Sequence, residues 1–116
     1  MRKLSLIGLA AIAWCAAPAE AHAFLQHADP GAGARLAIAP TKVVLRFSEE
    51  LEPAFSSVAI TDGSGRNVAA GPVLIRGNAM LAPVRLLKPG TYRVAWHVVS
   101  LDNHRTQGVY GFVVKP

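Results

Sequence analysis

The sequence predicts an all-β protein, a sandwich or barrel of about seven short antiparallel strands. Apolar residues alternate with a period of two, and Gly or Pro turn signals separate these runs at intervals of about 8–12 residues. Beyond the first 21 residues no stretch shows a helical period, and only residues 49–56 could form a short helical turn, which Pro53 limits. A chain of 116 residues has room for one domain of this kind.

Six of the strands can be placed directly, over residues 42–48, 58–61, 73–75, 80–86, 92–99 and 109–114. In the first, Val43, Leu45 and Phe47 face one side, which is typical of a half-buried strand. The second ends at an Asp-Gly-Ser-Gly turn and the third at Gly-Asn, after which the fourth can pair with the third. A Lys-Pro-Gly turn precedes the fifth, whose Tyr92 and Trp96 we interpret as core aromatics. The sixth alternates in the same way.

The first 21 residues have the organisation of a secretory signal peptide. A basic Met-Arg-Lys start is followed by an apolar run over residues 4–17 and by Ala-Glu-Ala, which predicts cleavage after Ala21. The apolar run is short for a membrane-spanning helix, which needs about 20 residues. We therefore expect a signal peptide over residues 1–21 and a mature, periplasmic domain over residues 22–116.

Charge and cysteine content exclude several classes of function. The chain has a formal net charge of +5, and loss of Arg2, Lys3 and Glu20 with the signal peptide leaves +4. The basic residues are dispersed along the sequence and do not alternate with aromatic residues, so we expect no nucleic-acid partner. The single cysteine, Cys15, lies in the predicted signal peptide, which excludes a disulfide framework and a cysteine-rich metal site in the mature chain.

Histidines and one aspartate are the candidate functional residues. Asp102 and His104 are two positions apart, so an extended backbone projects both to the same side, as a two-ligand metal half-site or as an ordinary solvated loop. Cleavage after Ala21 would give His22 a free α-amine beside its imidazole, and the two can chelate one metal ion. Three nitrogens and one oxygen favour Cu(II) over other divalent ions, and the lack of a thiolate argues against a blue-copper or cysteine zinc site.

Several stretches resemble the CopC family of exported copper-binding proteins. They are the mature start over residues 22–33, residues 47–55 and 90–96, and the motif Val-Val-Ser-Leu-Asp-Asn-His over residues 98–104, followed by Gly108 and Phe112. The resemblance implies an Ig-like Greek-key β-sandwich that binds one Cu(II) per chain through His22, Asp102 and His104. It also implies a CopD-type inner-membrane copper transporter as partner, and we expect a monomer.

The resemblance also has departures and open alternatives. The mature chain has one methionine, Met80, so the Met-rich Cu(I) site of some family members is not expected, and Phe24 replaces a histidine that members often carry. We expect His27 to lie on the surface and His97 to face away from the core aromatics.

Two other functions stay open beside a non-enzymatic copper carrier. One is a metal-free Ig-like interaction module. The other is a copper oxygenase with a terminal-histidine site, which the short chain and an aspartate ligand disfavour. Under the carrier hypothesis, three polar residues near the ligands could orient them: Ser100, Asn103 and Thr106.

Overall fold

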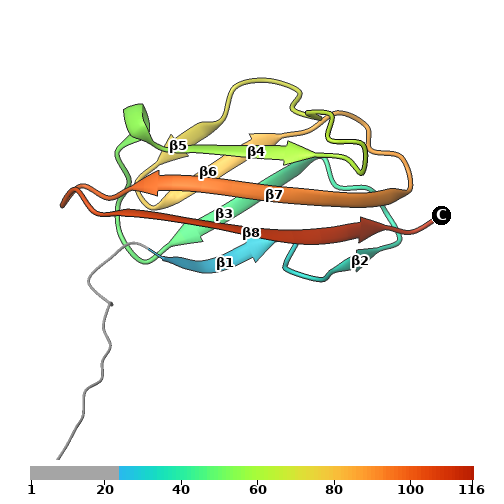
Figure 1. Cartoon of the computed structure of the whole chain (residues 1–116), viewed down its shortest axis with the longest axis horizontal. Coiled ribbons are helices and arrows are strands. Elements are labelled where there is room, and N and C mark those ends of the chain that lie inside the picture. Colours follow the sequence, from blue (N-terminus) through green and yellow to red (C-terminus); the bar gives the residue numbers. More distant parts are fainter. Residues whose placement is uncertain (1–23) are drawn as a thin grey trace, which may run out of the picture.

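Two four-stranded β-sheets face each other in the computed structural model, which describes residues 24–116 (Figure 1). One sheet has the order β1-β3-β6-β5 and the other β2-β8-β7-β4. The strands are β1 (Leu25–Asp29), β2 (Arg35–Leu36), β3 (Lys42–Phe47), β4 (Ser57–Thr61), β5 (Leu74–Arg76), β6 (Ala79–Pro83), β7 (Gly90–Val99) and β8 (Arg105–Val114). The predicted all-β sandwich is confirmed, with each of the six placed strands present.

One pair of strands departs from the expected antiparallel pattern. β2 runs parallel to β8, with Arg35 opposite Val113 and Leu36 opposite Val114. The chain reaches β2 after crossing over from β1 in the other sheet, and such a crossover does not impose the antiparallel direction of a hairpin. Only β5–β6 and β7–β8 are neighbours both in sequence and in a sheet, so the other connections pass between the sheets.

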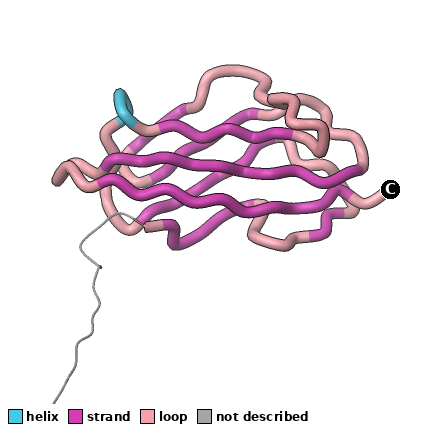
Figure 2. Tube along the Cα trace, viewed as in Figure 1, coloured by secondary structure: helices cyan, strands magenta, loops and turns pink. Residues whose placement is uncertain are grey.

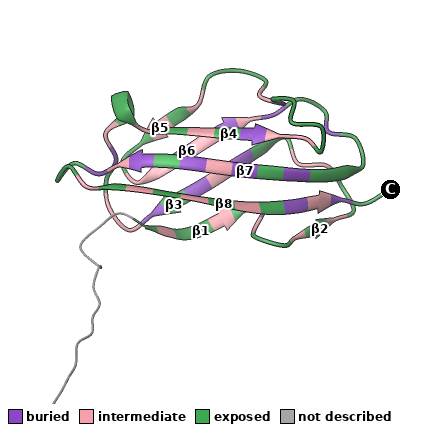
Figure 3. Cartoon of the chain, in the orientation of Figure 1, coloured by how far each residue is buried: buried purple, intermediate pink, exposed green. Residues whose placement is uncertain are grey.

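The core lies between the sheets and is closed by aromatic rings. Tyr92 and Trp96 are buried, as predicted, with 5% and 7% of their surface exposed. The Phe47 and Trp96 rings meet edge to face with centroids 5.2 Å apart, and the Tyr92 and Phe112 rings stack at 5.4 Å. Figure 3 shows the alternation of buried and exposed positions along β7, which follows from the period of two in a strand.

A glycine allows Trp96 to lie against the neighbouring strand. Gly108 is opposite Trp96 in the β7–β8 ladder, and a Cβ atom at this position would be 2.4 Å from Cζ2 of the indole. The ring therefore occupies the space that a side chain on Gly108 would need. This close approach closes the core near the end of the sandwich where β7 ends and β8 begins.

The short helical turn predicted before β4 is present as a 3₁₀ helix. It is η1 (Pro53–Phe55), drawn in cyan in Figure 2, and the proline stands in its first turn, where a missing N–H costs no hydrogen bond. Within residues 24–116 there is no helix with the length and apolar character needed to cross a membrane.

Tyr110 provides a test of the packing between β8 and the loop that follows β1. Its hydroxyl donates a 2.8 Å hydrogen bond to the Pro30 carbonyl. Burial, and to a lesser extent the Asp29 carboxylate, raises the pKa of Tyr110 to about 12 from an ordinary value of 10.0. Because the unfolded chain ionises first, the stability contributed by neutral Tyr110 is complete below pH 10 and is lost as the pH rises toward 12.

We therefore expect the melting temperature to fall between pH 10 and 12, and to fall less steeply in Tyr110→Phe. The substitution also removes one hydrogen bond, which lowers stability at neutral pH by about 1 kcal/mol. Thermal unfolding followed by circular dichroism at a series of pH values tests both effects. If the melting temperatures of the two proteins fell in parallel with pH, the Tyr110 hydroxyl would not contribute to the pH dependence of stability.

Candidate metal centre

The turn between β7 and β8 carries the Asp-x-His motif and is held by its own backbone. The Ser100 N–H donates to the His104 carbonyl at 2.9 Å, and the Asn103 N–H donates to the Ser100 carbonyl at 2.8 Å. Asn103 has a φ of 72°, in the left-handed region that asparagine tolerates better than most residues with a side chain. The turn thus places residues 102 and 104 side by side at one end of the sandwich (Figure 1).

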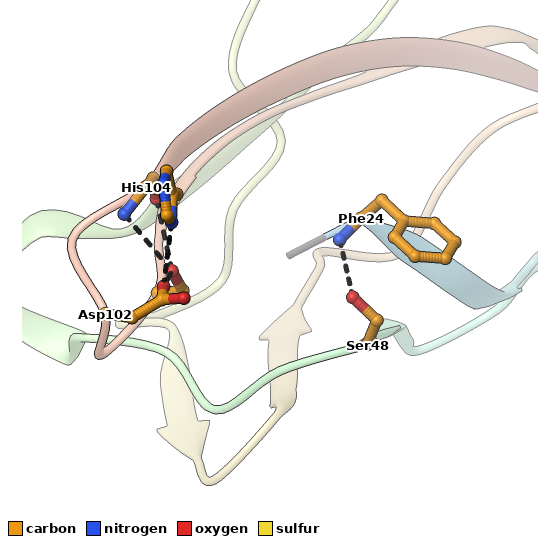
Figure 4. A network of polar contacts seen from close by, with 5 residues as sticks. Phe24, Ser48, Asp102 and His104 are labelled. Atoms are coloured by element: carbon orange, nitrogen blue, oxygen red, sulfur yellow. Dashed lines mark hydrogen bonds and ion pairs between the residues drawn. The ribbon is translucent and has the colours of Figure 1, made fainter. Parts of the chain in front are cut away.

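Asp102 and His104 form one polar cluster with Ser100. The Asp102 Oδ1 atom lies 3.2 Å from His104 Nδ1 and accepts a short hydrogen bond from the Ser100 hydroxyl (Figure 4). Ser100 is fully buried, while the side chains of Asp102 and His104 are 47% and 43% exposed. The hydrogen bond from Ser100, followed by that with His104, holds the pKa of the Asp102 carboxyl below its ordinary value. The carboxylate is therefore ionised and fixed, yet open to solvent.

One short segment connects this turn with the start of β1. We call residues 48–52 the linking segment. At one end, the Ser48 Oγ accepts a 3.0 Å hydrogen bond from the Phe24 N–H, and the Ser48 N–H donates to the Phe24 carbonyl. Two residues further on, the Glu50 carbonyl accepts a 3.0 Å hydrogen bond from the Leu101 N–H. The first described residue and the Asp-x-His turn thus lie at the same end of the molecule, as Figure 4 shows.

Carboxylates cluster beside the Asp-x-His turn. Glu49, Glu50 and Glu52 belong to the linking segment, and Asp102 lies on the turn beside it. A cluster of one sign raises the local concentration of ions of the opposite sign. This surface is therefore suited to approach by a metal cation. The sequence alone does not show this feature, because the glutamates are distant from the motif along the chain.

The separation of Asp102 and His104 fits two ligands of one metal ion. Neighbouring ligand atoms on an ion with bonds of about 2.0 Å are roughly 2.8–3.3 Å apart, at angles between square-planar and tetrahedral. The observed 3.2 Å between Oδ1 and Nδ1 is within this range, although the Nδ1 atom itself is covered from solvent. Within residues 24–116 no three His, Cys, Asp or Glu side chains are grouped closely enough to hold a metal. The described part of the chain thus presents two donors.

The other predicted positions fall into two groups. His22 lies outside the described residues. His27 is exposed on β1 opposite Arg46, and His97 is exposed on β7 opposite Gln107, so neither joins Asp102 and His104. The predictions that His27 is a surface residue and that His97 faces away from the core are confirmed.

The fold and the site together define a class of protein, a small β-sandwich that presents oxygen and nitrogen donors at one end. The CopC domain matches the chain over residues 25–115, so the chain belongs to the CopC family. It is 42% identical over 99 residues to Protein YobA of Escherichia coli strain K12, covering 82% of this chain and 80% of the relative. It is 37% identical over 107 residues to Copper resistance protein C of Escherichia coli, covering 84% of each.

Solved structures agree with this assignment. CopC from Methylosinus trichosporium OB3b superposes with a TM-score of 0.72 and 37% identity, covering 82% of this chain and 95% of that one. PcoC, described as a methionine-rich copper resistance protein from Escherichia coli, has a TM-score of 0.71 at 36% identity, covering 81% and 99%. The function of this chain is therefore related to copper, and it belongs with the copper-binding and copper-resistance proteins and not with enzymes.

Asn103, the residue with a left-handed backbone in this turn, allows a test of how the turn positions the Asp-x-His motif. We expect Asn103→Gly to preserve the turn, whereas Asn103→Val places a β-branched side chain at a φ of 72° and lowers stability by about 1–3 kcal/mol. Chemical denaturation measures both changes. Equal stability of the valine and glycine variants would show that the backbone strain at this position has no effect.

Proposed function

We propose that the chain is a periplasmic Cu(II)-binding protein. In this proposal the signal peptide over residues 1–21 is removed after Ala21, and the domain over residues 22–116 binds one copper ion as cargo. His22 supplies its α-amine and imidazole, His104 a second imidazole, and Asp102 a carboxylate oxygen. Three nitrogens and one oxygen form the ligand set that tetragonal Cu(II) prefers.

The observation that carries the proposal is the linking segment. It holds Phe24 at Ser48 and the Asp-x-His turn at Glu50, positions that are two residues and thus at most about 7 Å apart along the backbone. His22 precedes Phe24 by two residues, which also gives it a reach of about 7 Å. A residue with this reach can meet Asp102 and His104 without any change in the described fold.

The chemistry of the described pair supports a cation as the ligand. The Asp102 carboxylate is ionised, Ser100 fixes it, and the glutamates of the linking segment add negative charge around it. The Asp102 and His104 side chains are both almost half exposed, so the pair lies at the surface of the domain and not in its core. We assign the protein to copper homeostasis, as a monomer that buffers Cu(II) for resistance or uptake and delivers it to a CopD-type inner-membrane transporter.

The experiment compares two chains that differ only at the terminus. One begins at His22, and the other carries Ala21 ahead of it, which converts the α-amine of His22 into an amide. Both are titrated with Cu(II) against a competing chelator, and their copper sites are characterised by electron paramagnetic resonance. We expect one-to-one binding by the first, a nitrogen-rich tetragonal spectrum, and a loss of about 100-fold or more in affinity in the second, since a ligand is lost.

Each alternative has its own outcome. Equal binding by both chains would place the copper away from the amine and contradict the role of His22. Failure of both to bind would support a metal-free interaction module. Copper-dependent turnover of oxygen or peroxide would support the oxygenase. Sequencing the N-terminus of the exported protein tests cleavage after Ala21 separately.

A further inference from the structure

The fold collects positive charge at the end opposite the candidate metal centre. The cationic residues are dispersed along the sequence, yet the strand register brings six of them to the end where β3 and β7 begin and β8 finishes (Figure 1). They are Arg35, Lys42, Arg66, Arg85, Lys88 and Lys115. We call this the basic end.

The charges of the basic end are not neutralised by neighbours. Among residues 24–116 the only ion pair is that of Asp102 with His104. Two carboxylates accompany the six cations. Asp62 Oδ1 accepts hydrogen bonds from the Ser64 hydroxyl and from the N–H groups of Ser64 and Arg66, so it is occupied in its own turn. Asp29 ends β1 opposite Val44, two residues from Lys42. Six cations and two carboxylates leave the side chains of the basic end with a net charge of about +4.

Two apolar side chains protrude from the same end. Leu86 is 92% exposed and lies in sequence between Arg85 and Lys88, and Ile38 is 83% exposed in the connection after β2. The two connections lie side by side, because the Val84 N–H donates to the Thr41 carbonyl at 3.0 Å. These are the two most exposed large apolar residues of the described chain.

A cleft opens between the basic residues. It has a volume of about 480 Å³ and lies between the turn at residues 62–68 and the connection at residues 85–92, where Arg66, Arg85 and Lys88 line it. Its three cationic side chains outnumber its one carboxylate, Asp62, and its size suits a phosphate-bearing head group. The one aromatic residue that lines the cleft, Tyr92, is 5% exposed and its ring stacks on Phe112 in the core, so it offers little surface for stacking a nucleotide base.

We propose that the basic end docks on the surface of an anionic phospholipid bilayer. Clustered cations are attracted to anionic lipids, and isolated apolar tips enter the interface between head groups and acyl chains. A protein partner would instead favour a continuous apolar patch with aromatic residues, which this end does not have. The bilayer is a membrane that the exported chain meets, so the choice of membrane rests on the proposed export.

Docking in this orientation would direct the metal centre away from the bilayer, so the docked chain would hold copper and only the undocked chain would deliver it to an inner-membrane transporter. The sandwich would stand with its long strands pointing outward, with Asp102, His104 and the glutamates of the linking segment on the side that faces solvent. The four carboxylates at that end are nearly balanced by Arg46, Arg76 and Arg105, so the orientation is set by the charge of the basic end.

The experiment uses the copper-free chain that begins at His22 and two triple variants. Lys42→Gln/Lys88→Gln/Lys115→Gln removes three charges from the basic end. Arg46→Gln/Arg76→Gln/Arg105→Gln removes three from the half that carries the metal centre, and serves as the matched control with the same net charge. Binding is measured by co-sedimentation with vesicles of phosphatidylglycerol and phosphatidylethanolamine, and with vesicles of phosphatidylcholine.

We expect binding to the anionic vesicles only, and its loss in 1 M salt, where the screening length is about 3 Å. Each cation near the surface contributes about fivefold in affinity, so the lysine variant should bind about 100-fold more weakly, whereas the arginine variant should bind almost as well as the parent. Leu86→Ser should weaken binding without changing the net charge.

Three results would overturn the proposal. The first is no binding to anionic vesicles. The second is an equal loss of vesicle binding in both triple variants, which would mean that the net charge of the whole chain drives binding and that no particular end of it faces the bilayer. The third is binding to soluble polyglutamate but not to vesicles, which would identify an acidic protein as the partner. Because the test uses no copper, its result is independent of the outcome of the copper titration.

Discussion

Replacing His104 by alanine is expected to reduce Cu(II) affinity by about 100-fold or more. Loss of a residue that orients a ligand typically costs 10–100-fold in metal affinity, and His104 is proposed to be a ligand itself. Its ring is 43% exposed and lies outside the core, so the stability of the copper-free protein should change by less than about 0.5 kcal/mol. Titration against a competing chelator, with thermal unfolding of the copper-free protein, measures both quantities.

His97 provides the matched control for this substitution. It is also an exposed histidine, located on the outer face of β7 opposite Gln107, and it does not contact Asp102 or His104. His97→Ala should therefore retain the parent affinity and the parent paramagnetic spectrum. Retention of full affinity in His104→Ala, or a comparable loss in His97→Ala, would contradict the proposed site.

Replacing Phe47 by alanine is expected to have the largest effect on stability. Phe47 has no exposed surface, and its ring packs edge to face against Trp96 with centroids 5.2 Å apart. Truncation of a buried phenylalanine costs about 3–5 kcal/mol, because apolar contacts are lost and a cavity remains. For a domain of this size, the melting temperature should fall by about 15–30 °C.

Phe55 is the control for the loss of a phenyl ring. It is 70% exposed in η1, so Phe55→Ala should change the melting temperature by no more than a few degrees. Denaturant unfolding of both variants gives the two free energies of unfolding on one scale. A similar decrease in the free energy of unfolding of both variants would mean that the packing of Phe47 against Trp96 does not determine the stability lost in Phe47→Ala.

Periodicity was sufficient to predict the strands that form the core. Along β3 and β7 every second residue is apolar, and the structure buries Val43, Leu45, Phe47, Tyr92 and Trp96 as expected. β1 was not predicted, because Leu25–Asp29 mixes exposed polar residues with small ones and its register shifts between Leu25 and His27. β2 has two residues, which is too short for a period to appear.

The candidate site was predictable only in part, for a physical reason. Asp102 and His104 are two positions apart, so local geometry alone places them together. Ser48 and Glu50 reach the site through hydrogen bonds to Phe24 and Leu101, which are distant in sequence, and no local pattern encodes these contacts. The close approach of Trp96 to Gly108 likewise depends on the pairing of two strands, and a glycine in isolation does not reveal it.

The position of β1 at the edge of its sheet has a consequence for the lifetime of bound copper. β1 pairs with β3 alone, and its first residue is separated from the rest of the ladder by the register shift at Leu25. Strand ends with one neighbour open locally at a small fraction of the free energy of global unfolding. If the terminus carries two of the four ligand atoms, opening of this strand end would detach half of the coordination while the core stays folded. Copper residence time would then follow the fraying of β1 and not the unfolding of the sandwich, and a partner could extract the ion by binding the first residues of this strand.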